Sequence, residues 1–467
     1  MRFPVKALVK RLPSGALIIG ALLGATASLA AAPVDNSVPE HYIVMLRAST
    51  DPLAVARAHG LAPARVYRAA LTGFAGAVPA GRLEALRADP RVQAVVADRV
   101  VSIPPPPPVV SEMPAATGKV SGGGSTVGQV VPAGVSRIGA DPTLSALPVS
   151  AYTGAGVGVA IVDTGIDFNH PDLTVAAACF TAYTSCQDDH GHGTHVAGIV
   201  AARNNTQDVV GVAPDATLYA VKVLDQGGSG TDSAIILGLD WIRANAPSLN
   251  PQIRVVNMSL GRPGSLDDNP VLRSAVKALH DGDATNGIAP ITVVVATGND
   301  AASEVSQQVP ATYPEVLAVA STTASDGAIG CTQIKRDTAS SFTTDGKFDV
   351  ITRIGVTISA PGEQQEDVSK GCLIRSVGIL STRLGGGTTR MSGTSMASPH
   401  VAGVVARMWD KADDVAGGIL APETARDKIR ASAAAPGSAP LNSPTRSYTF
   451  DGEREGVVSV VGALSEP

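Results

Sequence analysis

Five short segments of almost unbroken apolar residues recur after residue 150, and helical patterns separate them. They read VGVAIVDTG, ATLYAVKVL, IRVVNMSLG, ITVVVATGN and EVLAVAST. A strand with one exposed face alternates polar and apolar residues, whereas a strand buried on both faces is apolar throughout. Strands of the second kind, joined through helices, predict an α/β fold with a mostly parallel sheet and helices on both faces. In such sheets, functional residues gather just beyond the carboxyl ends of the strands.

The composition of the chain is compatible with a large core. Hydrophobic residues make up 44% of the 467 residues, and charged residues make up 16%. With this composition we do not expect the chain to be globally disordered. The formal net charge is −5, and no basic tract follows the N-terminal region. We therefore expect no nucleic-acid partner.

The first thirty residues have the pattern of a secretory signal. A basic head is followed by an apolar run that starts at Ala16 and ends in small residues. Ser28-Leu29-Ala30 fits the small-x-small pattern of a signal-peptidase cleavage site. Cleavage there would give a signal peptide of residues 1–30. A membrane anchor is the alternative, because the run is long enough to span a bilayer, but its Gly/Ala content favours export. Export predicts a secreted protein, extracellular or periplasmic, with no membrane attachment once the signal is removed.

A small domain precedes the apolar segments. Residues 38–103 alternate between strand and helix patterns in a βαββαβ-like order, which is typical of a compact α+β module. Residues 104–128 then contain five consecutive prolines and a Gly/Ser run. Such a segment cannot build a core and indicates an exposed linker that a protease could cut. We expect the α/β domain to occupy residues 129–467.

The chain has four cysteines, at positions 179, 186, 331 and 372. An even number in an exported protein favours disulfides, and three pairings are possible. Pairing of sequence neighbours, Cys179 with Cys186 and Cys331 with Cys372, closes the shorter loops and is the pairing we expect. A zinc site is the alternative, but no CxxC occurs and the spacing does not suit one.

Three segments carry residues suited to nucleophilic catalysis. Asp163 ends an apolar strand, three histidines (His190, His192 and His195) lie in HGHGTHVAG, and Ser395 opens a helical pattern. Taken singly, a turn aspartate, a packing or metal-binding histidine and a serine helix cap would explain them. Taken together, they supply a nucleophile, a base for its proton and a carboxylate for the base. The chain order Asp, His, Ser is one in which such triads occur.

The residues around Ser395 are small, which would let a helix start approach a substrate backbone closely. We expect Pro399 near that helix start, where a missing N–H costs least. An α/β-hydrolase would instead require G-x-S-x-G and the order Ser, Asp, His. Neither is present in this chain.

The motifs VDTGID, HGTHVAGI and GTSMASPHVAG resemble the three catalytic signatures of the subtilisin-like serine peptidases, the subtilases. The resemblance covers most of residues 129–465 and implies a serine endopeptidase that acts on polypeptides. It implies Asp163, His192 and Ser395 as the triad, because the first His of HGTH is catalytic in the family. It also implies that Asn299, in VVATGND, stabilises the oxyanion together with the N–H of Ser395.

The resemblance extends to substrate and partners. VKVLDQGGSG and NMSLG resemble the two edges between which the family adds its substrate as a strand, which implies substrate-binding roles for Gly228, Ser229, Gly230, Ser259, Leu260 and Gly261. Recognition through the backbone implies broad specificity. Residues 38–103 resemble an inhibitor-type propeptide, which would act as an intramolecular inhibitor and be removed by the enzyme itself. We expect the enzyme to be a monomer.

A structural calcium ion is also implied by the resemblance, because RNNTQDVVGVAP matches the length of the family's calcium loop. The implied ligands are the carbonyls of Arg203, Gln207 and Val209 and the side chains of Gln129, Asp172 and Asn205. Oxygen ligands on flexible backbone suit Ca²⁺ rather than Mg²⁺ or zinc. An ordinary Asn-rich turn is the alternative. Asp208 adds a carboxylate that departs from the family's loop.

The sequence therefore predicts a secreted serine endopeptidase of broad specificity, made as a pre-pro-enzyme and processed by itself. One alternative is a dedicated processing protease with a narrow substrate. Another is a non-catalytic binding protein on the same scaffold. That protein would be expected to lack a triad residue or Asn299, and all four are present.

Overall fold

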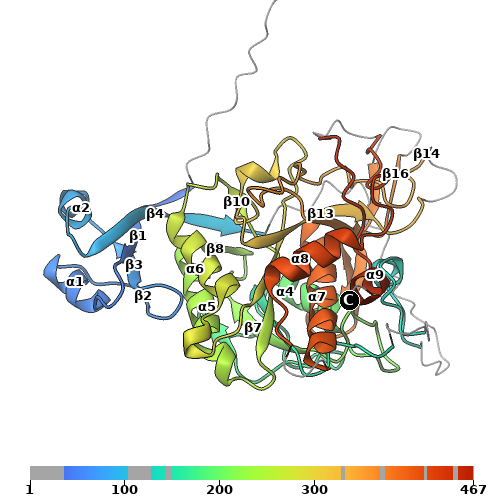
Figure 1. The fold of residues 1–467 in the computed structure, drawn as a ribbon, viewed down its shortest axis with the longest axis horizontal. Helices are drawn as coiled ribbons and strands as arrows, with labels where there is room; N and C mark the ends of the chain where they lie inside the picture. Colours follow the sequence, from blue (N-terminus) through green and yellow to red (C-terminus); the bar gives the residue numbers. More distant parts are fainter. Residues whose placement is uncertain are drawn as a thin grey trace, which may run out of the picture. The chain divides into compact units, whose positions relative to one another are not determined.

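The structure is a computed structural model, shown as a ribbon in Figure 1. It describes residues 36–103, 128–143, 150–327, 332–368, 374–414, 418–444 and 451–465. The expected signal peptide, nearly all of the expected linker, and both Cys331 and Cys372 lie outside the described residues.

The N-terminal module has its strands and helices in the order that the sequence patterns indicate. They are β1 (Ser37–Leu46), α1 (Pro52–Ala58), β2 (Arg65–Tyr67), β3 (Gly73–Ala77), α2 (Ala80–Arg87) and β4 (Val92–Ser102). The strands pair antiparallel in the order β2-β3-β1-β4 and pack on a small core that includes Val44, Phe74 and Leu86. The end of β4 continues the sheet by pairing with β8 (Ser229–Thr231).

The larger sheet has seven strands in the order β15-β13-β11-β9-β5-β7-β6, and every adjacent pair is parallel. The five apolar segments form its five central strands, which are β5 (Gly158–Asp163), β7 (Thr217–Lys222), β9 (Ile253–Met258), β11 (Thr292–Ala296) and β13 (Val316–Thr323). The flanking strands β6 (Phe180–Thr181) and β15 (Ile358–Glu363) were not anticipated.

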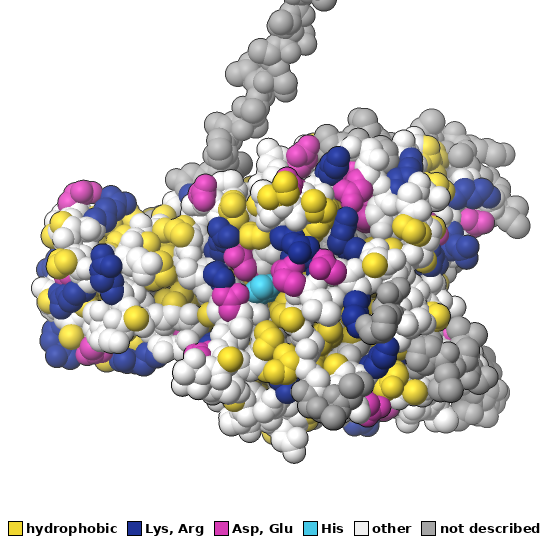
Figure 2. All heavy atoms as spheres, viewed as in Figure 1, with side chains coloured by type: hydrophobic (Ala, Val, Ile, Leu, Met, Phe, Trp, Pro, Cys, Tyr) yellow, Lys and Arg dark blue, Asp and Glu magenta, His cyan; other side chains and the backbone are white. Residues whose placement is uncertain are grey.

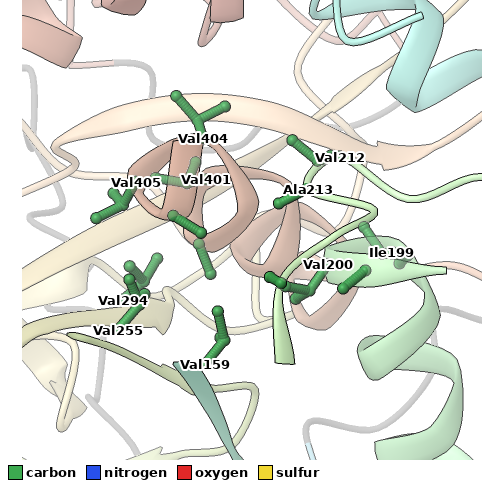
Figure 3. Packing of buried hydrophobic residues seen from close by; sticks show 14 of the residues in the cluster. Val159, Ile199, Val200, Val212, Ala213, Val255, Val294, Val401, Val404 and Val405 are labelled. Atoms are coloured by element: carbon green, nitrogen blue, oxygen red, sulfur yellow. The ribbon is translucent and has the colours of Figure 1, made fainter. Parts of the chain in front are cut away.

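Helices cover both faces of this sheet, so the α/β prediction is confirmed. Helices α4 (His192–Ala201) and α7 (Thr394–Asp414) pack on one face, and α5 (Asp232–Asn245) and α6 (Pro270–Asp281) pack on the other. Figure 3 shows strand valines such as Val159 and Val255 beneath Val200 and Val401 of the first pair of helices. Because successive strand residues point to opposite faces, Val159 and its neighbour Ala160 belong to different core clusters.

The remaining elements lie around this framework. They are α3 (Ala133–Arg137), η1 (Ala246–Ser248), β10 (Arg262–Pro263), η2 (Ala284–Asn286), η3 (Val305–Gln307), β12 (Gln308–Val309), β14 (Thr332–Gln333), β16 (Gln365–Val368), β17 (Ile374–Val377), β18 (Ile379–Thr382), β19 (Thr388–Met391), α8 (Pro422–Ala431) and α9 (Val460–Ser465). None of the helices in the described ranges combines the length and the apolar character that a membrane span requires.

Acidic and basic side chains are intermingled on the face of the molecule shown in Figure 2. Two elements that lie on this face, α6 and α8, are joined by an ion-pair cluster: Glu423 of α8 accepts from His280 of α6 at 3.1 Å. Arg426 of α8 pairs with the same carboxylate at 2.6 Å. The contact between His280 and Glu423 therefore links the two helices, whereas the buried Arg426 holds Glu423 within α8.

Candidate active site

Asp163 and His192 meet at the carboxyl edge of the large sheet. Asp163 is the last residue of β5, His192 is the first residue of α4, and both side chains are buried. The imidazole Nδ1 lies 2.8 Å from Asp163 Oδ1 and 3.0 Å from Oδ2. A carboxylate at Nδ1 holds the proton there, so that Nε2 is left as the proton acceptor. Nε2 has no hydrogen-bond partner among the described residues.

The other two histidines of the motif have different environments. His195 is fully buried, and its Nε2 lies 3.1 Å from the carbonyl oxygen of Ile379. Burial lowers the pKa of His195 to about 3, so this side chain is a neutral packing residue at ordinary pH. His190 is exposed, and its Nδ1 accepts the backbone N–H of His192 at 3.3 Å. Only His192 contacts a carboxylate in the way that a general base requires.

Asp188 organises the approach to His192, and sequence reasoning did not single it out. Its Oδ1 accepts from Gly191 N at 2.9 Å and from the Thr164 hydroxyl at 2.9 Å. Its Oδ2 accepts from Thr194 N at 2.9 Å and from the Thr194 hydroxyl at 2.6 Å. One buried carboxylate thus caps the start of α4 and ties it to the residue after Asp163. An acidic residue just before a helical pattern was the available signal.

Ser395 is the second residue of α7 and is almost fully buried. Its hydroxyl donates to the carbonyl oxygen of Ser259 at 3.3 Å. It forms no hydrogen bond with His192 in the described part of the chain. Nucleophile–base hydrogen bonds are often long in proteins without bound substrate and tighten in the reacting complex. The structure therefore contains the predicted hydrogen bond between Asp163 and His192. It contains no hydrogen bond between Ser395 and His192 among the described residues.

Pro399 lies inside α7, as its sixth residue, rather than at the helix start where we expected it. An N–H at position 399 would bond the Ser395 carbonyl four residues earlier, and proline has none. The hydroxyl of Ser259 donates to that carbonyl at 2.8 Å instead. The Asn257 amide in turn donates to the Ser259 hydroxyl at 2.9 Å and accepts from Ser398 at 2.6 Å. This network gives the Ser395 carbonyl the hydrogen bond that Pro399 cannot supply, and it fixes the backbone of Ser395.

Asn299 follows β11 and faces the start of α7. Its Oδ1 accepts from Thr394 N at 2.9 Å and from the Thr394 hydroxyl at 3.0 Å. These two donors identify Oδ1 as the acceptor atom and fix the orientation of the amide plane. A Cβ at Gly393, where φ is +152°, would lie 3.1 Å from Asn299 Nδ2. Glycine at this position lets the amide approach the helix start closely.

The predicted substrate-binding residues form two edges with a strand of the chain itself between them. Val100–Ser102 of β4 pairs antiparallel with Ser229–Thr231 of β8. Ser102 also exchanges two backbone hydrogen bonds with Gly261, at 3.3 and 3.1 Å. Ile103 N donates to the Gly228 carbonyl at 3.0 Å. Leu260, which precedes Gly261 in the second edge, is fully buried.

The disulfide between Cys179 and Cys186 is present in the structure. It closes the loop that precedes Asp188 and therefore restrains the segment that leads to His192. The expected bond between Cys331 and Cys372 falls outside the described residues.

The six predicted calcium ligands lie together around the amide of Gln129. Gln129 Nε2 is 2.6 Å from Arg203 O, 3.0 Å from Val209 O, and 3.4 Å from both Asn205 Oδ1 and Gln207 O. Asp172 is fully buried beside them and accepts from Asn205 Nδ2 at 2.7 Å. Burial raises the pKa of Asp172 to about 6. No group of three His, Cys, Asp or Glu side chains suited to a metal occurs in the described ranges, so these carbonyl and amide oxygens are the candidate donors.

The parallel sheet and the residues at its carboxyl edge define the class of this protein. A family model described as "Subtilase family" matches residues 154–456, which is most of the chain, and the chain belongs to that family. Among curated proteins, it is 39% identical over 289 residues to subtilisin E of Bacillus subtilis (strain 168), across 61% of this chain and 62% of that protein. It is 38% identical over 289 residues to M-protease of Shouchella clausii (strain KSM-K16), across 62% of each.

The alignment spans 86% of a subtilisin of Bacillus pumilus, at 39% identity. For the other relatives named above it spans about 62% of their length. The family membership predicted from the three motifs is confirmed by these matches.

Proposed function

We propose that the protein is a secreted serine endopeptidase that hydrolyses peptide bonds in polypeptides. The observation that carries the proposal is the buried hydrogen bond between Asp163 and His192 Nδ1, at 2.8 Å. It leaves Nε2 as a base in a site that also contains Ser395. A binding protein on the same scaffold would have no use for a buried carboxylate–imidazole pair whose Nε2 has no hydrogen-bond partner among the described residues.

The proposed reaction assigns a separate step to each residue. His192 Nε2 takes the proton of the Ser395 hydroxyl as the oxygen attacks the substrate carbonyl. Asp163 stabilises the imidazolium that results, and His192 then donates this proton to the leaving amine as the C–N bond breaks and the acyl-enzyme forms. Asn299 Nδ2 and the backbone N–H of Ser395 donate to the oxyanion, and water later hydrolyses the acyl-enzyme. The network around Ser259 and Asn257 holds the nucleophile's backbone during these steps.

The substrate is proposed to bind as an extended strand between the Gly228–Gly230 edge and the Ser259–Gly261 edge. Main-chain hydrogen bonds of this kind are independent of the substrate's side chains. Specificity is therefore proposed to be broad. A narrow processing enzyme would show a sharp cleavage profile across a peptide library, whereas the proposed enzyme would show a diffuse one.

Residues 38–103 are proposed to be an inhibitory propeptide, within a zymogen that carries the signal at residues 1–30. Its contacts with the α/β domain go beyond the strand in the cleft. Asp98 accepts from Ser233 N at 3.0 Å and so caps the start of α5. Further along α5, Asp240 accepts from the backbone N–H groups of Ala69 and Ala70, both at 2.7 Å. Removal of the module would free the cleft, and the mature enzyme is proposed to be a monomer.

Replacing Asn299 with alanine is expected to lower kcat by about 10²–10³, with KM nearly unchanged, because only the transition state carries the oxyanion. The measurement is steady-state hydrolysis of a chromogenic peptide by the matured protein. Asn286→Ala, at an exposed turn, is the matched control and should retain wild-type kcat. A wild-type kcat in Asn299→Ala would remove this side chain from the mechanism.

We also propose that a structural Ca²⁺ binds where Arg203 O, Gln207 O, Val209 O and the side chains of Asn205, Asp172 and Gln129 gather. The support is the ring of four oxygens within 3.4 Å of a single Gln129 atom. A turned Gln129 amide would present its own oxygen to the same point. A set of carbonyl and amide oxygens with one carboxylate suits Ca²⁺.

Calcium is expected to raise the thermal unfolding midpoint of the uncut Ser395→Ala chain by several degrees over the value in excess chelator. Ligand at about 100 times Kd stabilises a folded protein by about 2.7 kcal/mol. The uncut chain suffices because Gln129 already lies at the loop while Ile103 is in the cleft. Asp172→Asn should weaken the response, whereas Glu84→Gln, an exposed carboxylate on α2, should retain it. Equal midpoints with Ca²⁺ and chelator would refute the site.

A further inference from the structure

The loop that follows the second edge of the cleft contains a buried group of three charged side chains. Arg262, the residue after Gly261, donates to both oxygens of Asp232, at 2.6 Å from Nη2 and 3.1 Å from Nε. Its Nη1 lies 2.5 Å from Oδ2 of Asp268, the residue before the N-cap of α6. Asp232 is fully buried and Arg262 nearly so. One guanidinium therefore serves two carboxylates, and the group has an excess of one negative charge at neutral pH.

Asp268 presents its other oxygen to the end of β4. Arg99 Nη2 lies 3.1 Å from Asp268 Oδ1, and this carboxylate is 13% exposed. Arg99 therefore balances the charge of the buried group while the N-terminal module is in place. Arg273, a cation on α6, is bound to Glu315 at 3.0 Å instead. Removal of residues 38–103 would thus leave Asp268 Oδ1 without the cation that it binds in the uncut chain.

Arg99 reaches Asp268 from a strand that lies where the proposed substrate strand would lie. The residues directly after Arg99 pair antiparallel with β8. Side chains alternate along a strand, so Arg99 and Val101 point to the same face. Val101 is 1% exposed whereas Val100 is 40% exposed, so this face is turned toward the α/β domain. A substrate strand in the same register would direct one of its side chains toward Asp268.

We propose that Asp268 is a specificity-determining residue that binds a basic side chain of the substrate, at the position where Arg99 lies in the uncut chain. The proposal rests on the proposed peptidase function and adds one preference to an otherwise broad specificity. An arginine or lysine at this position would neutralise the excess charge of the buried group, whereas a neutral side chain would not. The preferred substrates are extended polypeptides with a basic residue upstream of the residues that pair with Gly230 and Gly261.

A set of fluorogenic peptides tests this preference in the matured wild-type protein. The peptides share one cleavable core, and arginine replaces its neutral isostere citrulline at one upstream position at a time. We expect kcat/KM to be about three- to tenfold higher with arginine at a single position, a gain between those of an exposed ion pair and a buried charged hydrogen bond. The gain should shrink as salt screens the pair. Equal kcat/KM values for arginine and citrulline at every upstream position would overturn the proposal.

Asp268→Asn removes the charge and retains the size of the side chain. Arg262 keeps its bonds to Asp232 in this variant, so the buried charges remain paired. The preference for arginine should disappear, while kcat/KM for the citrulline peptide stays unchanged. Asp267→Asn, at the exposed neighbouring carboxylate, is the matched control and should keep the preference. A preference that persists in Asp268→Asn would assign the basic side chain to another partner and overturn the proposal.

The same peptides separate this proposal from the proposed function. If the matured protein hydrolyses them without a preference for arginine, the specificity proposal fails while the peptidase function stands. If it hydrolyses none of them, the proposed function fails and the specificity proposal fails with it. Slower maturation of Asp268→Asn with an unchanged preference for arginine would restrict Asp268 to binding the module, and this result would also overturn the proposal.

Discussion

Replacement of Ser395 by alanine is expected to abolish peptide hydrolysis and to leave the full-length chain uncut. The hydroxyl is the proposed nucleophile, and no neighbouring group can take its place. For the nucleophile of a subtilisin triad, the loss in kcat is about 10⁶-fold. The measurement is hydrolysis of a chromogenic peptide, together with electrophoresis of the chain over time.

Ser248→Ala, at an exposed position beyond α5, is the matched control and should mature and hydrolyse peptide normally. A thermal unfolding midpoint near that of the chelated wild type would show that Ser395→Ala is folded. A folded Ser395→Ala chain that still matures alone and cleaves peptides would disprove the proposed mechanism.

Replacement of Asp163 by asparagine is expected to lower kcat by about 10⁴ at neutral pH. The amide can donate a hydrogen bond to Nδ1 and so favour the tautomer in which Nε2 carries the proton. His192 could then no longer accept the Ser395 proton, and no carboxylate would stabilise the imidazolium. The measurement is kcat as a function of pH, because a change in tautomer alters the profile while a loss of folded protein only scales it.

Asp427→Asn, an exposed carboxylate on α8, is the control for the loss of one negative charge. It should keep kcat within a few-fold of the wild type and leave the pH profile unchanged. A loss of less than tenfold in a folded Asp163→Asn protein would show that the 2.8 Å contact with His192 is structural rather than catalytic.

The central sheet could be predicted because its five strands are buried on both faces and are therefore continuously apolar. Strand β15 escaped prediction because its segment ISAPGE contains serine, proline, glycine and glutamate. Its polar residues are nevertheless buried, since Ser359 donates to Glu455 and Glu363 accepts from Ser376. A partner distant in the sequence makes such a strand possible, and the local pattern contains no sign of it.

The candidate site was predictable to the extent that short motifs carry it. Asp163, His192 and Ser395 lie in three such motifs, and the family match supports reading them together. Asp188 was missed because its donors come from two separate segments. Thr164 follows β5, whereas Gly191 and Thr194 lie at the start of α4. The role of Ser259 at the Ser395 carbonyl was missed for a similar reason, since it compensates for Pro399, which lies 140 positions away along the printed sequence.

The register of Val100–Ile103 in the cleft could not be obtained from the sequence either. The proline run alone indicates an exposed linker, and the pattern of β4 alone indicates a strand of the module. Only the pairing of Ser102 with Gly261 shows how far the chain enters the cleft before the prolines begin.

The central claim is that Asp163 and His192 activate Ser395 as a nucleophile, and covalent labelling tests it most directly. The matured protein is treated with a fluorophosphonate, which reacts with activated serine hydroxyls, and the modified residue is mapped by mass spectrometry. We predict one modified side chain, Ser395, and loss of labelling in a folded His192→Ala variant that has been matured by added wild-type protein. Peptide hydrolysis without modification of Ser395, or labelling of Ser395 that persists unchanged in His192→Ala, would contradict the account.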